Sequence, residues 1–232
     1  MKKGFTLSEV LITLGIVGVV AVLTIPAIMK NYRDKTYIAQ LKKVYGQLSE
    51  ATQTIITDEQ SDNFYHTTGG VKQSCSNIND GICEKGAGYF LNKYLKIVHN
   101  NCAEGYKCIS NNYTNAAGET VGGINDKSYC VQTANGATIC TSYEPSVSGI
   151  ADKACLSLII DVNGPAKPNI TGKDVFAVDI HNDGSISDYY SGCSDGNKGC
   201  DPTLCNTDKT SIFSAACGCL NSVVEEGWKY KD

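Results

Sequence analysis

VLITLGIVGVVAVLTIPAIM, residues 10–29, is the stretch that decides the fold of this 232-residue chain, and it contains no charged residue. Twenty residues of α-helix are about 30 Å long, which matches the hydrocarbon core of a bilayer. A secretory signal peptide has a shorter apolar region, about 7–15 residues, followed by a small-residue cleavage site; here KNYRDK follows instead. A core helix would need protein on all sides. The sequence therefore predicts a membrane-embedded helix.

Apolar side chains continue beyond this run at steps of three and four residues. They are Tyr37, Ile38, Leu41, Val44, Tyr45, Leu48, Ala51 and Ile55. Charged and amide side chains fill the other positions, which is typical of a helix that is apolar on one face only. We therefore predict one helix over residues 5–58, spanning the membrane in its first half. Pro26 removes a backbone donor, so we expect a kink or an unwound stretch near residues 22–26.

The cysteines are confined to the second part of the chain. The twelve are Cys75, Cys83, Cys102, Cys108, Cys130, Cys140, Cys155, Cys193, Cys200, Cys205, Cys217 and Cys219. An even number predicts a disulfide framework in an oxidising compartment. Zinc is the main alternative, but there is no C-x2-C pair and the three histidines, His66, His99 and His181, are scattered. Neighbouring cysteines give the expected pairs, Cys75–Cys83, Cys102–Cys108 and Cys130–Cys140.

Turn residues in the second part separate short apolar runs. Asn135-Gly136 predicts a hairpin between its flanking segments. Residues 154–162 form an apolar strand candidate, and residues 174–180 alternate before an Asn-Asp-Gly turn into a second hairpin. The predicted fold class is α+β: a long N-terminal α-helix packed on a small antiparallel β-sheet with disulfide-rich loops. The helix precedes a cysteine-rich globular domain over residues 59–232.

Residues 179–190 partly fit a calcium-binding loop, with Asp179 first, Asp183 fifth and Gly184 sixth. Tyr190, however, stands at the twelfth position, where a bidentate Glu is required. A hairpin turn explains Asp183-Gly184 without any ion.

A second oxygen-rich set, Asp161, Asn163 and Asp174, surrounds a predicted turn. Neither set makes a metal site the favoured interpretation, and we expect no metal or other cofactor. No motif that pairs a nucleophile with a base is present, so we expect no enzyme. A net charge of −4 gives no reason to expect a nucleic-acid partner.

The segment KKGFTLSEVLITLGIVGVVAVLTIPAIM, with its glycine, aromatic residue, Thr-Leu and glutamate ahead of an apolar helix, resembles the N-terminal segment of type IV pilins and type II secretion pseudopilins. Ser8 stands where isoleucine is more usual. The close resemblance covers about the first 55 residues. IIDVNGPAKPNITGKDVFAVDI and the ending VVEEGWKY are similar to pseudopilin-like globular domains. Some major pseudopilins bind calcium in this region, which keeps that alternative open.

The resemblance implies a processing step. Prepilin peptidase would cut between Gly4 and Phe5, so that residues 1–4 are a leader, and would methylate the new Phe5 amine. Other implied partners are further pilin or pseudopilin subunits, the inner-membrane assembly platform and membrane lipid. The chain would sit in the inner (cytoplasmic) membrane as a single-pass protein, with the globular domain outside the cytoplasm, before it enters an extracytoplasmic filament.

Glu9 and Pro26 are the implied assembly residues. A carboxylate near the bilayer core costs about 2.5–3.5 kcal/mol on insertion scales, so it needs a partner. In the family picture, Glu9 neutralises the Phe5 amine of a neighbouring subunit. The alternative is that Glu9 is simply an acid in the first turn of a helix, where the dipole favours it. Gly15 and Gly18 either allow close helix packing or are merely tolerated.

Two functions remain open on the sequence alone. One is a structural subunit of an envelope filament, a type II secretion pseudopilus or a type IV pilus. The other is a membrane-tethered minor tip subunit or binding module that recognises a substrate, a surface or DNA, which the large second domain favours. A tethered enzyme is a third, weaker alternative.

Overall fold

The computed structural model describes residues 4, 6–71, 74–77, 82–100, 102, 108–110, 112–124, 128–141, 155–190 and 199–230. Phe5, Cys193 and the side chains of Cys75 and Cys155 lie outside the described residues. The chain divides into two compact units, Met1–Thr36 and Tyr37–Asp232. Helix α1 (Leu7–Asp58) contributes to both units.

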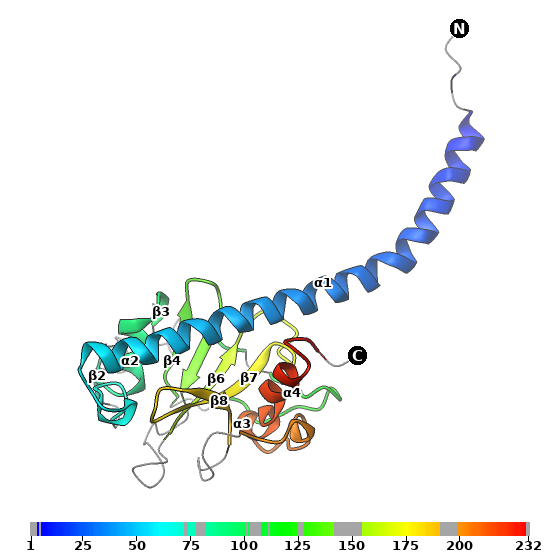
Figure 1. Cartoon of the computed structure of the whole chain (residues 1–232). Coiled ribbons are helices and arrows are strands. Elements are labelled where there is room, and N and C mark those ends of the chain that lie inside the picture. The colour runs from blue at the N-terminus through cyan, green and yellow to red at the C-terminus, as the bar shows by residue number, and fades with distance from the viewer. Residues whose placement is uncertain are drawn as a thin grey trace. The chain divides into compact units, whose positions relative to one another are not determined.

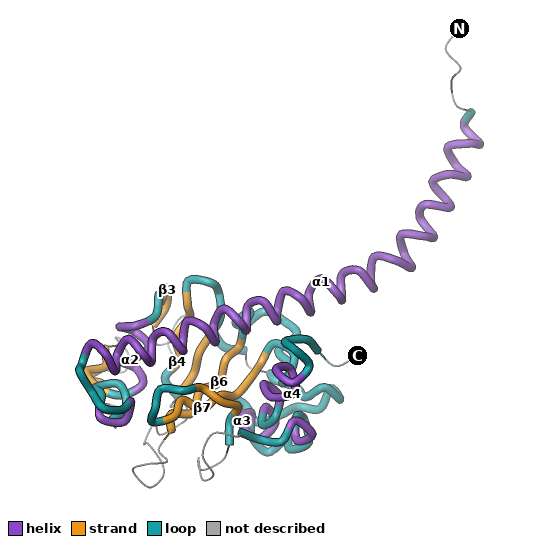
Figure 2. The backbone as a smooth tube through the Cα atoms, viewed as in Figure 1, coloured by secondary structure: helices purple, strands orange, loops and turns teal. Residues whose placement is uncertain are grey.

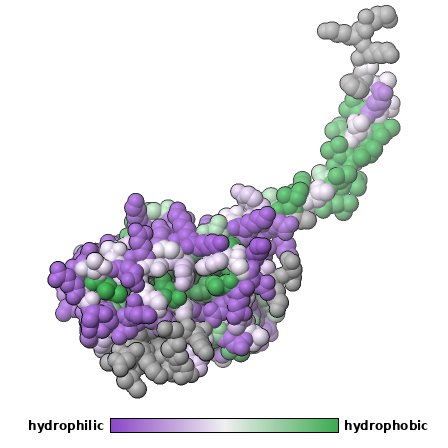
Figure 3. Space-filling view, in the orientation of Figure 1, coloured by the Kyte–Doolittle hydropathy of each residue, from purple (hydrophilic) through white to green (hydrophobic). Residues whose placement is uncertain are grey.

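The first unit consists of the apolar part of α1. Its large side chains are exposed all round, for example Leu7 at 80% and Leu23 at 73%, and its described surface is mostly hydrophobic (Figure 3). The helix is long and apolar enough to cross a membrane. It is α-helical without a break through Pro26, so the expected unwound stretch is absent. Proline removes a single backbone donor, and the turns on both sides keep their own bonds.

The second unit is built on antiparallel sheets and short helices (Figures 1 and 2). A two-stranded sheet pairs β1 with β2, and a six-stranded sheet has the order β3-β4-β5-β6-β7-β8. The strands are β1 (Ser74–Asn77), β2 (Ile82–Lys85), β3 (Ile97–Asn100), β4 (Cys130–Thr133), β5 (Thr138–Thr141), β6 (Cys155–Asp161), β7 (Val175–His181) and β8 (Ile186–Asp188). The helices after α1 are η1 (Phe64–His66), α2 (Ala87–Tyr94), η3 (Pro202–Leu204), α3 (Ile212–Ala216) and α4 (Cys219–Glu225). The predicted α+β class is confirmed.

The hairpins form where the turn residues predict them. Gly136 has φ 89° between β4 and β5, and Gly184 has φ 79° between β7 and β8. Glycine adopts such angles at no steric cost because it has no Cβ. Strands β6 and β7 pair over seven residues, from Cys155 opposite His181 to Asp161 opposite Val175. It is the longest pairing in the six-stranded sheet, and both strands lie between other strands.

The alternation of side chains on β6 and β7 makes two cores. Leu158 and Val178 belong to the cluster that includes Leu41 and Leu48 of α1, all at 1% exposure or less. Their sequence neighbours, such as Ile159, belong to a second cluster with residues of α3. The sheet is therefore covered on both faces, and the second part of α1 lies across one of them (Figure 1).

Disulfides fix the loops of the second unit. The expected pairs Cys102–Cys108 and Cys130–Cys140 are present. Cys75 lies opposite Cys83 in the β1–β2 register, and Cys83 is in a disulfide. Two further bonds, which we call the C-terminal disulfides, tie η3 and its flanks to the start of α4: Cys200–Cys217 and Cys205–Cys219.

Candidate functional site

Thr6 and Glu9 form a reciprocal cap at the start of α1. The Thr6 backbone N–H and its hydroxyl both donate to Glu9 Oε2, at 2.8 and 2.7 Å. The Glu9 N–H in turn lies 3.3 Å from Thr6 Oγ1. This is a capping box, which satisfies two of the free N–H groups at a helix start. The alternative that Glu9 stabilises its own first turn therefore has a geometric basis.

The cap uses one carboxylate oxygen of Glu9 and leaves the other available. Both bonds from Thr6 go to Oε2, and no described residue bonds to Oε1. Further along the helix, a methyl group placed on Gly15 or Gly18 would meet no atom within 4 Å. The helix thus presents an acid with one unused oxygen and two open glycine positions, a surface on which a cation and a neighbouring helix fit.

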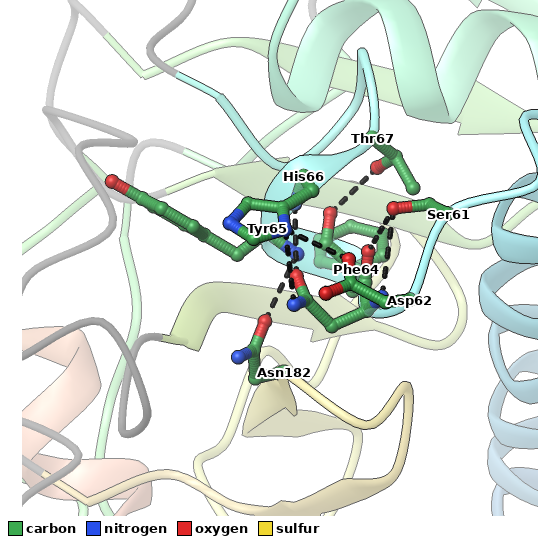
Figure 4. A network of polar contacts seen from close by, with 8 residues as sticks. Ser61, Asp62, Phe64, Tyr65, His66, Thr67 and Asn182 are labelled. Carbon is green, nitrogen blue, oxygen red and sulfur yellow. Dashed lines mark hydrogen bonds and ion pairs between the residues drawn. The ribbon is translucent and has the colours of Figure 1, made fainter.

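A polar network joins the end of α1 to the β7–β8 turn (Figure 4). The backbone N–H of Phe64 donates to Asn182 O at 2.7 Å, and that of Tyr65 donates to Asn182 Oδ1 at 3.0 Å. Thr52 Oγ1 of α1 donates to Gly184 O at 2.8 Å. These bonds fix the turn on the helix, so the network is a structural brace.

The same network contains an ion pair, His66 Nδ1 with Asp62 Oδ1 at 2.7 Å. The hydrogen bond from His66 lowers the pKa of the Asp62 carboxyl. Both side chains are more than half exposed. No described serine, threonine or cysteine bonds to His66, so the pair lacks a nucleophile to activate.

Asp161 and Asp174, from the oxygen-rich set, are both fully buried. Tyr113 donates to Asp161 at 3.3 Å, and the N–H groups of Asn169 and Ile170 donate to Asp174 at 2.8 and 2.6 Å. Burial raises the pKa of both carboxyls, and for Asp161 the charge of Asp174 adds to the rise.

Two amide oxygens of the same region, Asn163 Oδ1 and Asn169 Oδ1, are buried without a hydrogen-bond partner. Carboxylate and amide oxygens are the ligands that hard cations prefer. These four side chains are the described ones most suited to hold such an ion. Within the described part of the chain, no group of three or more His, Cys, Asp or Glu is placed to hold a metal.

The 179–190 segment is a hairpin rather than an ion-binding loop. Asp183 accepts from the N–H and hydroxyl of Ser185, at 2.9 and 2.6 Å. Asp179 accepts from Ser157 Oγ at 2.6 Å, on the neighbouring strand. Both carboxylates thus accept hydrogen bonds from serines of the hairpin or of the neighbouring strand.

Asp188 holds the start of α4 on the sheet. Its two oxygens accept the N–H groups of Gly218 at 2.7 Å and Asn221 at 2.9 Å. Burial raises the pKa of Asp188 to about 7 and that of Asp179 to about 6. Both side chains are fully buried. Protons bound here therefore contribute to the stability of the second unit.

Thr6 was not predicted as the partner of Glu9, although the Thr-x-x-Glu spacing is the signature of a capping box. Asp188 and Asn182 were not predicted either, because their partners lie far away in the sequence and leave no local pattern. Phe5, the expected processing residue, lies outside the described residues, and Gly4 is exposed.

One family model matches the chain. Residues 1–25 match the model described as the prokaryotic N-terminal methylation motif, and this range includes Gly4, Phe5 and Glu9. No curated protein and no solved structure matches the chain. The similarity to known proteins is therefore concentrated in the segment that contains the capped glutamate.

Proposed function

We propose that this chain is a filament protein of the type IV pilin and pseudopilin-like family, a proposal supported by the match of residues 1–25 to the prokaryotic N-terminal methylation motif. In this proposal the chain is a structural subunit of an envelope filament, a type II secretion pseudopilus or a type IV pilus. The observation that carries it is the helix of the first unit, whose apolar stretch has no buried residue and follows the capped acid Glu9. Such a surface needs lipid or other helices to cover it.

Processing is the first step of the proposed function. Prepilin peptidase cuts between Gly4 and Phe5 and methylates the new amine. The removed leader contains Lys2 and Lys3, so the net charge of the chain changes from −4 to −6. Before cleavage these lysines hold the leader on the cytoplasmic side of the membrane. The mature subunit then stays in the inner membrane by its helix, with its domain outside the cytoplasm.

Assembly is the second step, and Glu9 carries it. Its Oε2 keeps the cap with Thr6, and its Oε1 accepts a hydrogen bond from the Phe5 amine of a neighbouring subunit. An ion pair in so dry a place is favourable only when both charges have good partners. The retained cap supplies the second partner of the carboxylate, and the pair fixes the axial register between subunits.

A minor tip subunit is the second candidate function. The disulfide-stapled domain that follows α1 is the observation that favours it, since a specialised domain is what a binding module needs. Both candidates share the helix, the peptidase, the assembly platform and the surrounding lipid. Members of this family are typically structural, and neither candidate gives the chain a catalytic role.

The test is the intact mass and N-terminal sequence of the chain recovered from its native membrane. We expect a start at Phe5 with one added methyl group, and recovery of the chain in sheared filaments. A start at Met1, or a cut after the apolar run, would overturn the proposal. Glu9→Gln should be processed but poorly assembled, whereas Glu84→Gln, an exposed acid of the domain, should assemble normally.

A further inference from the structure

A groove of about 650 Å³ runs beside α1 in the second unit, and we call it the side groove. One wall is the α1 segment from Lys43 to Thr54. The other wall is the link between α2 and β3, together with the β4–β5 turn. Its polar lining residues are Lys43, Gln47, Glu50, Thr54, Tyr94, Lys96 and Asn135.

The side groove contains polar groups that lack partners. The Tyr94 hydroxyl and the Asn135 side-chain nitrogen are buried and make no hydrogen bond. Lys43 and Lys96 are exposed and form no ion pair with any described residue. Buried polar groups are almost always hydrogen-bonded in native proteins. The groove has two lysines but only one carboxylate, Glu50, and two of its donors have no acceptor. It therefore suits a segment that brings carboxylates.

The chain itself carries a segment of that kind. Glu225 and Glu226 are consecutive exposed acids, and neither side chain has a described hydrogen bond or ion pair. The other consecutive pair of acids differs, because Glu59 accepts the Thr68 N–H at 2.6 Å. Lys229 follows three residues after Glu226 and is exposed, so this segment also offers one cation for Glu50.

The acidic segment is anchored by the residues that follow it. Gly227 and Trp228 have φ 69° and 63°, which makes a tight turn after α4. The Trp228 ring packs edge-on against Tyr45 with centroids 5.6 Å apart, and Lys42 Nζ lies 5.4 Å from its centroid. A rigid segment loses little conformational entropy when it binds.

The segment and the side groove lie on different flanks of α1. On a helical wheel with 100° per residue, Lys42 and Tyr45, which contact Trp228, point in one mean direction. The mean direction of the groove-lining residues Lys43 and Gln47 differs from it by about 150°. The buried stripe of α1 lies between these directions on the side of the sheet. The acidic segment is therefore not placed to enter the groove of its own chain.

We propose that the side groove receives the Glu225–Glu226 turn of a second copy of this chain. Lys43 and Lys96 pair with the two carboxylates, and Lys229 of the incoming turn faces Glu50. Because groove and turn are different surfaces, one copy can bind the next head-to-tail, which is the repeating contact that a filament needs. The inference rests on the proposed filament function. It names one contact between the second units of two neighbouring copies.

The test uses the full chain in its native membrane, with a mixture of 14N- and 15N-labelled copies. Zero-length carbodiimide coupling joins a lysine to a carboxylate in direct contact, and mass spectrometry identifies links between copies. We expect links from Lys43 or Lys96 to Glu225 or Glu226. Links that map elsewhere, or that join these lysines to a different protein, overturn the proposal.

Charge reversal supplies the control. Lys43→Glu with Lys96→Glu should lower the yield of links to the turn about tenfold, as should Glu225→Lys with Glu226→Lys. A chain with all four substitutions should regain coupling between copies. Its lysines would then lie on the turn and its glutamates in the groove. Lys85→Glu, an exposed lysine on β2, should change nothing. Failure of the combination to restore coupling in a correctly folded chain overturns the proposal.

The two proposals fail in different ways. If the mature, methylated chain forms filaments but gives no groove links, the side-groove contact is wrong and the filament function stands. If the chain is not processed at Phe5 but its copies in detergent still couple Lys43 to Glu226, the contact stands and the filament function is wrong.

Discussion

Raising the pH from 5 to 8 should destabilise the second unit. Asp188 and Asp179 are fully buried, and burial raises their pKa values to about 7 and about 6. An unfolded aspartate has a pKa of about 3.9. The folded chain therefore keeps protons on both carboxyls over a pH range in which the unfolded chain has lost them.

The sign and size of the effect follow from this difference. A carboxyl with a raised folded-state pKa contributes stability that is complete below its unfolded value and is lost as the pH rises through the folded value. Within that window, each pH unit lowers the free energy of unfolding by about 1.4 kcal/mol. By this rule, the contribution of Asp188 to the free energy of unfolding falls by about 3 kcal/mol between pH 5 and 8, and that of Asp179 falls by about 1 kcal/mol. Burial shifts Asp161 and Asp174 in the same direction.

The assay is urea unfolding of the full chain in detergent micelles at pH 5, 6, 7 and 8. The single tryptophan, Trp228, reports on the second unit by its fluorescence. We expect the free energy of unfolding to fall by about 4 kcal/mol, a large share of the 5–15 kcal/mol typical of a domain. Asp188→Asn should remove the fall between pH 6 and 8, and the exposed Asp58→Asn should keep it.

Stability that is constant or increases from pH 5 to 8 would refute the reasoning. So would an Asp188→Asn variant with the wild-type slope, because the carboxyl would then not be the titrating group. Wild-type and variant values must be compared at each pH, since the variant also loses an acceptor for the Gly218 or Asn221 N–H.

Two further predictions concern the region around α4. Reduction of the C-terminal disulfides should cost about 2–5 kcal/mol for each bond, so reductant should lower the melting temperature reported by Trp228; an unchanged melting temperature contradicts this. Gly218→Ala should destabilise the domain by at least about 1–3 kcal/mol in the same assay, because Gly218 has φ 83° and a Cβ would lie 2.2 Å from the Asp201 carbonyl oxygen. Gly123→Ala, where a Cβ meets nothing within 4 Å, is the control.

The parts of the fold that follow from local chemistry could be predicted from the sequence. The amphipathic stripe through Leu41 and Leu48 indicated the buried face of α1, because helical periodicity is a local property. Asn135-Gly136 indicated the β4–β5 turn because few other residue pairs adopt its angles. The N-terminal motif was equally local, and its glutamate, glycine and aromatic residue were visible in sequence order.

The parts that depend on distant contacts could not be predicted. Val98 continued the apolar spacing of the helix before it, yet α2 ends at Tyr94 and Val98 lies in the edge strand β3, 55% exposed. Pairing with β4 decided its conformation, and a helical pattern cannot report that. The acids of the segment that partly fits a calcium loop were visible too, but Asp188 bonds to N–H groups about thirty residues away.

Each unit of the chain contains a feature that a single copy leaves incomplete. In the first unit, Glu9 is capped on one oxygen while the other has no described partner, and the helix beyond it exposes apolar side chains on all sides. In the second unit, the side groove buries donors without acceptors, while the acids that suit it lie on another flank of α1. A monomeric soluble protein has no physical reason to keep either feature. Both would be satisfied when one copy is followed by the next, and the two can be tested separately, because Glu9→Gln leaves the groove intact and Lys43→Glu with Lys96→Glu leaves the helix intact.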